Sequence, residues 1–85
     1  MLTLYSKNNC GFCTQAKKIL DRYNITYQEI KIDENATAKE FVTSRGHRTV
    51  PQIYLNEELF VEGGYNGLSK LTEQEIRNKL KILVE

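Results

Sequence analysis

The chain is poor in several residue types and has no excess of one charge. Its 85 residues include one proline, one histidine, one methionine and two cysteines. Twelve basic and eleven acidic side chains leave a net charge of +1, with no block of one sign and no internal repeat. This balance argues against a nucleic-acid-binding protein and against a basic membrane-binding patch. At this length we expect a single domain over residues 1–85.

Long apolar runs are also missing. The opening MLTLYSKNNC contains no stretch that would serve as a signal peptide or a transmembrane helix. We therefore expect a cytoplasmic protein. In that reducing compartment a persistent structural disulfide is unusual.

The residues that are present alternate between strand and helix patterns. We expect strands over 2–5 and 25–32, a hairpin of strands over 52–55 and 59–61, and helices that begin near Phe12, after Asn35 and at the Thr72–Glu75 capping box. Ile76, Leu80 and Leu83 form the apolar side of the last helix, and residues 62–67 are interpreted as a turn. The order strand–helix–strand–helix–strand–strand–helix predicts a small α/β fold with a mixed four-stranded sheet.

The two cysteines, Cys10 and Cys13, form a C-x-x-C pair directly ahead of the first helical pattern. A structural zinc site needs about four ligands, and His47 is the only histidine, so we expect no metal site. A structural disulfide over three residues would close too small a loop to remove much unfolded-state entropy. Two unconnected thiols packed as small hydrophobic residues are the remaining structural interpretation.

Redox chemistry explains the placement of the pair better than these alternatives. Cys10 precedes the helix, where free backbone N–H groups lower the pKa of a thiol, and Lys7 adds positive charge nearby. Cys13 falls one turn later, inside the helix, and is therefore more buried. An exposed nucleophile with a shielded partner is the arrangement that dithiol exchange requires.

Two loops carry the remaining candidates. Pro51 is the only proline, and taken by itself it is expected to be a trans residue at the start of a strand. It holds Val50 in an extended conformation, in which the Val50 backbone can pair with a peptide-like substrate. The segment GGYNG is either a simple turn or a place where the backbone approaches a ligand. We expect His47 to be an exposed loop residue without an acid–base partner.

Taken together, residues 5–20, RTVPQIYL and GGYNGL resemble the glutaredoxins, which are glutathione-dependent dithiol oxidoreductases with a thioredoxin-like fold. The resemblance covers nearly the whole chain. It implies that Cys10 is the nucleophile, that Cys13 resolves the mixed disulfide, and that the Val50–Pro51 bond is cis. It also implies a monomer that reduces protein or glutathione mixed disulfides, with ribonucleotide reductase as one protein substrate. The glutathione-binding residues that it implies are Lys7, Phe12, Arg48, Thr49, Val50, Pro51, Gly63, Gly64, Tyr65 and Asn66.

Three positions depart from the glutaredoxin pattern. Asn66 and Gly67 stand where glutaredoxins commonly carry two aspartates. We expect the loss of these carboxylates to weaken binding of the γ-glutamyl end of glutathione. Gly11 replaces the common proline, as in glutaredoxins that hold a [2Fe–2S] cluster between two subunits. Two alternatives therefore stay open beside the glutathione-dependent enzyme. One is an electron donor coupled to thioredoxin reductase, and the other is a glutathione-ligated iron–sulfur carrier.

Overall fold

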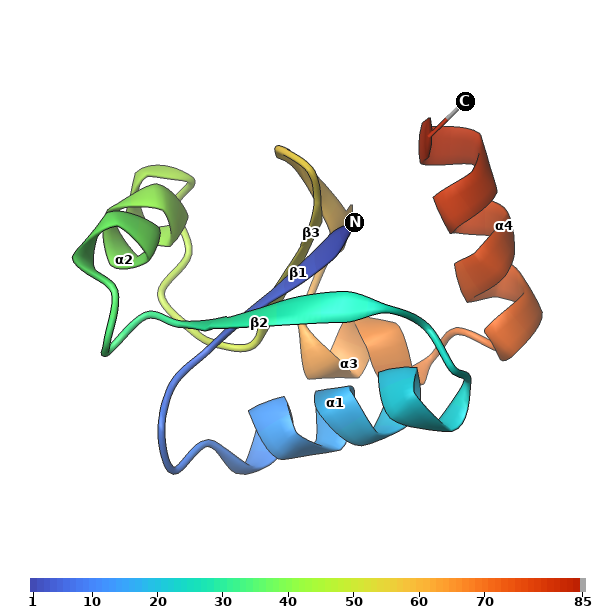
Figure 1. The fold of residues 1–85 in the computed structure, drawn as a ribbon, viewed down its shortest axis with the longest axis horizontal. Coiled ribbons are helices and arrows are strands. Elements are labelled where there is room, and N and C mark those ends of the chain that lie inside the picture. The colour runs from blue at the N-terminus through green and yellow to red at the C-terminus, as the bar shows by residue number, and fades with distance from the viewer. Residues whose placement is uncertain (85) are drawn as a thin grey trace.

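The computed structural model describes residues 1–84, and the side chains of residues 1–81. Figure 1 shows a central sheet with helices on both sides of it. The elements are β1 (Leu2–Ser6), α1 (Gly11–Arg22), β2 (Tyr27–Lys31), α2 (Ala36–Ser44), β3 (Gln52–Leu55), β4 (Glu58–Val61), α3 (Tyr65–Ser69) and α4 (Glu73–Val84).

The four strands form one mixed sheet in the order β2-β1-β3-β4. β1 runs parallel to β2 and antiparallel to β3, and β3 pairs with β4 as the expected hairpin. In the register between β1 and β3, Leu2 lies opposite Leu55 and Leu4 opposite Ile53. Because strand side chains alternate between faces, these four residues share one face of the sheet. The predicted fold class is confirmed.

The hydrophobic core lies between that face and three of the helices. Leu4, Leu20, Ile53, Leu68 and Ile76 are completely buried there, so β1, α1, β3, α3 and α4 all contribute to it. Figure 1 shows α1 and α3 together on this side of the sheet, with α4 at one end. Because α1 and α3 pack against each other, the starts of these two helices, which carry residues of the candidate site, lie side by side.

The other face of the sheet carries α2 and a group of aromatic side chains. The Tyr54 ring contacts the rings of Tyr5, Phe41 and His47 edge-on. His47 is half-buried, and its Nε2 atom lies 2.7 Å from the Tyr54 hydroxyl. The expectation that His47 is an exposed residue without a partner is therefore wrong. The partner comes from β3, which no local pattern around His47 could indicate.

Helix ends follow the sequence signals closely. The Asn35 side chain accepts a hydrogen bond from the Ala38 N–H and caps α2. Thr72 and Glu75 bond each other's backbone N–H groups, which confirms the capping box before α4. The side chain of Leu83 lies outside the described part of the chain.

One helix differs from the expected order. The segment interpreted as a turn continues into α3, which has five residues and no side-chain cap. Gly64 precedes it with φ of 57° and ψ of −121°. A helix of this length shows no apolar period of its own, and its position depends on the burial of Leu68 beneath it. The sequence pattern therefore could not predict it.

Candidate active site

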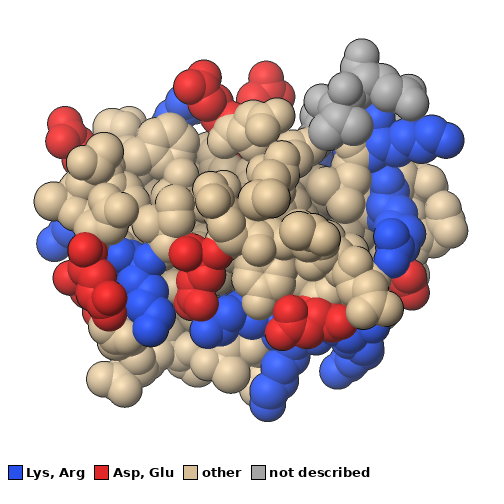
Figure 2. Space-filling view, viewed as in Figure 1, with Lys and Arg blue, Asp and Glu red and all other residues tan. Residues whose placement is uncertain are grey.

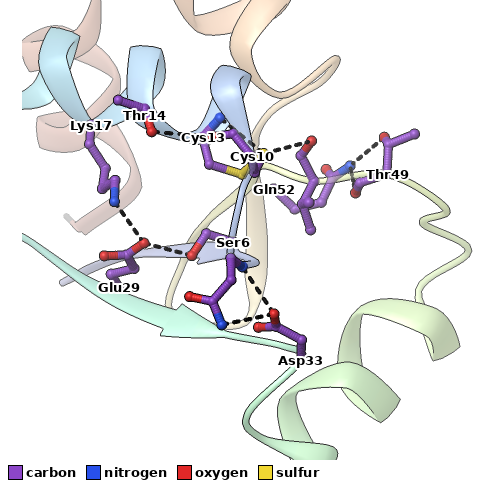
Figure 3. The surroundings of a disulfide bond; sticks show 11 residues. Ser6, Cys10, Cys13, Thr14, Lys17, Glu29, Asp33, Thr49 and Gln52 are labelled. Atoms are coloured by element: carbon purple, nitrogen blue, oxygen red, sulfur yellow. Dashed lines mark hydrogen bonds and ion pairs between the residues drawn. A yellow bond between two sulfur atoms is a disulfide. The ribbon is translucent and has the colours of Figure 1, made fainter.

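The two cysteines form a disulfide at the N-terminus of α1, with their Cα atoms 5.2 Å apart. Cys10 caps the helix, and its Sγ atom accepts a hydrogen bond from the Cys13 N–H at 3.2 Å. Cys10 is half-buried, whereas Cys13 is only 2% exposed. Figure 3 shows the pair above the end of β1. The difference in exposure is the one expected for an accessible and a shielded thiol.

The loop before β3 lies against this disulfide. The Val50 carbonyl oxygen is 3.9 Å from the Cys10 Sγ atom, and the Val50–Pro51 peptide bond is cis. Buried Gln52 steadies the loop by donating from Nε2 to the Thr49 carbonyl oxygen at 2.9 Å. Within residues 1–84 the structure gives the backbone groups of Val50 no backbone hydrogen bond. They are therefore open to a ligand that lies beside the disulfide.

Gly64 holds the opposite side of the loop. A Cβ atom at this position would overlap the Pro51 carbonyl oxygen, and the φ of 57° is one that glycine adopts most readily. Gly64 therefore lets the start of α3 approach Pro51 closely, which a larger residue would prevent.

A groove of about 230 Å³ opens between these segments. The Phe12 and Tyr65 rings stack over it, with centroids 5.6 Å apart and planes at 23°. Phe12 is 62% exposed, although it lies inside a helix. Seven of the residues predicted to bind glutathione line the groove: Phe12, Thr49, Val50, Pro51, Gly63, Tyr65 and Asn66.

Three other predicted residues lie outside the groove lining. Lys7 and Arg48 are exposed, and Gly64 is buried behind Pro51. The two cations are within the loops on either side of the disulfide, before α1 and before β3. Their part in ligand binding stays a prediction.

A polar network next to the disulfide was missed by the sequence analysis. The fully buried Ser6 hydroxyl donates to a Glu29 carboxylate oxygen at 2.7 Å, and Lys17 Nζ lies 3.0 Å from the same oxygen. The hydrogen bond from Ser6, followed by that from Lys17, holds the pKa of Glu29 below its usual value although burial opposes this. The network ties β1, β2 and α1 together (Figure 3). Its members lie 11 or more residues apart, so no local signal indicates them.

The loop between β1 and α1 is held by a second set of contacts. The backbone N–H and the side-chain Nδ2 of Asn8 both donate to Asp33, each at 3.0 Å. The backbone bond, with smaller contributions from the Asn8 side chain and from Lys31, lowers the pKa of Asp33. Asn8 thus anchors the loop that delivers Cys10 to the end of the sheet.

Gly67 occupies a position without room for a side chain. A Cβ atom there would overlap the Glu62 carbonyl oxygen and would lie 2.8 Å from a Val61 methyl group. The backbone therefore leaves no room at position 67 for the second of the two aspartates that glutaredoxins commonly carry. Asn66, by contrast, is exposed at the groove.

The fold and the site together define a class. A C-x-x-C disulfide caps the helix after the first strand, and it faces a cis-proline loop on a mixed four-stranded sheet. This is the arrangement of a thioredoxin-like dithiol protein.

Comparisons with known proteins narrow the class to a family. The glutaredoxin family model matches residues 2–60. The chain is 39% identical to the glutaredoxin-like protein NrdH of Lactococcus lactis over 71 residues, which are 84% of this chain and 99% of that protein. It is 33% identical to glutaredoxin 1 of Rickettsia typhi, in an alignment that covers 98% of this chain and 89% of that protein. The chain belongs to the glutaredoxin family and is a thiol oxidoreductase of that family.

Solved structures agree with this assignment. The buckwheat glutaredoxin–glutathione complex superposes with a TM-score of 0.74 at 27% identity, over 95% of this chain and 76% of that one. The NrdH-redoxin of Escherichia coli, described by its thioredoxin-like activity profile, has a TM-score of 0.66. The match covers 84% of this chain and 93% of the NrdH-redoxin, and a sequence identity of 20% supports the shared fold alone.

None of the helices in residues 1–84 combines the length and apolar character needed to cross a membrane. Over the same residues, no group of three or more His, Cys, Asp or Glu side chains is placed to hold a metal ion.

Proposed function

We propose that this protein is a glutathione-dependent thiol–disulfide oxidoreductase that reduces protein disulfides and glutathione mixed disulfides in the cytoplasm. The observation that carries the proposal is the groove beside Cys10, because seven predicted glutathione-binding residues line it. Disulfides of ribonucleotide reductase are the protein substrate that the family resemblance suggests.

The chemistry proceeds by two thiol exchanges. The Cys10 thiolate attacks one sulfur of the substrate disulfide, a mixed disulfide forms, and the displaced thiolate takes up a proton. The Cys13 thiolate then attacks Cys10 Sγ and releases the second substrate thiol. The substrate gains two electrons and two protons, and the protein ends in the Cys10–Cys13 disulfide seen in the structure. Two glutathione molecules restore the dithiol and leave as glutathione disulfide.

The helix N-terminus supports the role of Cys10. The Cys13 N–H points at the Cys10 sulfur from 3.2 Å, so in the reduced protein it stabilises a thiolate there. The open backbone groups of Val50 lie next to the same sulfur and can pair with the peptide backbone of glutathione. Phe12 and Tyr65 supply an apolar wall on the other side.

Single cysteine variants test the roles. We expect Cys10→Ser to abolish exchange with every substrate. We expect Cys13→Ser to lose reduction of protein disulfides but to keep turnover of a small glutathione mixed disulfide, which glutathione itself can resolve. The assay follows NADPH oxidation with glutathione and glutathione reductase. Full activity of Cys10→Ser would overturn the assignment.

A second electron source is favoured by specific observations. The match to the NrdH protein spans 99% of that protein, and the related NrdH-redoxin is described by a thioredoxin-like activity profile. The backbone at Gly67 also excludes one of the two aspartates that commonly hold glutathione. Regeneration by thioredoxin reductase in place of glutathione is therefore the alternative function.

The two electron sources can be separated in parallel assays. Activity only with glutathione and glutathione reductase supports the main proposal, and activity only with thioredoxin reductase supports the alternative. Asn66→Asp tests the groove directly, because the exposed carboxylate would offer a charge-assisted bond to the ammonium of glutathione. We expect it to lower the KM for glutathione. An unchanged KM would count against binding of glutathione in this groove.

The iron–sulfur alternative would take its protein ligands from Cys10 of two subunits and its other ligands from glutathione. In the structure Cys10 is joined to Cys13, so its sulfur is not free to hold a cluster. We derive no step through a cluster.

A further inference from the structure

A second groove continues from the active site along α1. It has a volume of about 220 Å³ and lies between α1 and the segment that contains α3. Tyr65 lines both this groove and the one beside the disulfide, so its side chain is a wall that the two share. The remaining walls include Gln15, Ile19, Leu68 and Ser69. A peptide held at the disulfide can therefore extend into the second groove across Tyr65.

The α1 wall of this second groove is positively charged. Lys18 and Arg22 line it, are exposed, and follow each other at the i, i+4 spacing that places side chains on one helix face. Among the side chains that the structure describes, no acidic one lines the groove. Figure 2 shows Lys and Arg side chains along the lower edge of the molecule, where Figure 1 places α1.

Other cations near this helix are already neutralised. Lys17 pairs with Glu29 at 3.0 Å, and Arg77 pairs with Glu73 at 2.9 Å. Lys18 and Arg22 make no ion pair with any residue of the described chain. Asp21 is the single acidic residue of α1 and lies on the β2 side of the helix. There the pKa of Tyr27 is raised, first by burial and second by the nearby Asp21. The two unpaired cations of α1 are thus the two that face the groove.

We propose that this groove binds an acidic, extended segment of the substrate protein next to its reacting cysteine. The proposal rests on the dithiol function above and adds a determinant of substrate choice. Phe12 lines the first groove and marks where a bound peptide would leave it. The α-helical rise places Lys18 ~9 Å and Arg22 ~15 Å along the axis from Phe12. An extended chain advances about 3.3 Å per residue, so acids about three and five residues from the substrate cysteine would reach them.

Synthetic disulfide peptides test this geometry. Each peptide has one internal disulfide and carries Asp at the third and fifth positions, either after the last cysteine or before the first. Matched peptides carry Asn or Lys at those positions. The protein is reduced and desalted before mixing, so a single turnover needs no other reductant, and peptide thiols are counted by mass spectrometry after acid quenching.

For the wild-type protein we expect one Asp peptide to react about fivefold faster than its Asn twin at low salt, from two exposed ion pairs. The assay is repeated in 0.5 M NaCl. Because salt at this concentration screens exposed charges, the preference for the Asp peptide should weaken there. In Lys18→Glu/Arg22→Glu we expect the preference to reverse toward the Lys peptide. The control variant Lys39→Glu/Lys81→Glu changes the net charge equally at two exposed sites away from the groove and should keep the wild-type preference.

Each variant's rate with the Asn peptide is its own reference and also reports that it is folded and active. Equal wild-type rates with Asp and Asn peptides would overturn the groove proposal while leaving the dithiol function intact. Loss of the preference in the control variant as well would also overturn it, because net charge would then be the cause. Failure of the wild-type protein to reduce any peptide would contradict the dithiol function, and the groove proposal with it.

Discussion

Gly64 provides the most direct test of how the active site is held together. In Gly64→Ala the new Cβ would overlap the Pro51 carbonyl oxygen, and alanine would have to adopt φ of 57° with ψ of −121°. A non-glycine residue in such a sparsely populated backbone region costs about 1–3 kcal/mol. Overpacking adds about 1–3 kcal/mol. We therefore expect the free energy of unfolding to fall by about 2–6 kcal/mol.

Two other glycines separate these contributions. Gly46 has φ of 86° but open space where its Cβ would be, so Gly46→Ala should cost about 1 kcal/mol from the backbone alone. Gly11 lies at the start of α1 with neither constraint. Gly11→Ala should therefore be neutral or should stabilise the protein by about 0.5 kcal/mol.

The three variants can be compared by urea unfolding of the oxidised protein, which keeps the disulfide constant. With an m-value of about 1 kcal/mol/M, the midpoint should fall by about 1 M for Gly46→Ala and by at least about 2 M for Gly64→Ala. If Gly46→Ala and Gly64→Ala lost the same stability, the close approach of Gly64 to Pro51 would contribute nothing, and the reasoning would be refuted.

Three further predictions concern the network, a helix cap and the exposed aromatic ring. Because the folded protein holds the pKa of Glu29 below its ordinary value of 4.5, chiefly through Ser6 and then Lys17, its stabilising effect is present above pH 4.5. The stability difference between wild type and Glu29→Gln, measured by urea unfolding across pH, should therefore shrink as the pH falls below 4.5; a difference that grew on acidification would contradict this. Asn35→Ala should lower the free energy of unfolding by about 1 kcal/mol through loss of the α2 cap, whereas Asn35→Ser should retain most of it. Phe12→Ala should change stability by less than about 1 kcal/mol, because the ring is 62% exposed, and yet slow disulfide exchange in the coupled assay; unchanged exchange would show that the stacked ring does not contact substrate.

Local rules account for most of what could be predicted. The caps at Asn35 and Thr72, the hairpin and the burial of Cys13 one turn after Cys10 all depend on residues within a few positions of each other. Signals of that range are visible in a sequence because the interactions themselves are local. The same holds for the fold class, since alternating strand and helix patterns with short connections leave few arrangements.

The features that could not be predicted depend on contacts between distant segments. The five-residue α3 has no period, His47 finds its partner on β3, and Ser6, Lys17 and Glu29 meet only when β1, α1 and β2 pack together. For each of these, the partner that gives the residue its environment lies elsewhere in the chain.

The sequence by itself determined the dithiol at a helix start, the sheet and its helices, because the spacing of neighbouring residues carries that information. Only the tertiary structure decided what surrounds the dithiol. The close packing of α3 against Pro51 shapes the groove beside Cys10, and the packing of α1 against α3 leaves Lys18 and Arg22 along its extension. The backbone of Gly67 lies so close to Glu62 that an aspartate side chain has no room at position 67. Grooves and exclusions of this kind arise from surfaces of separate segments that meet in space, and no single segment contains them.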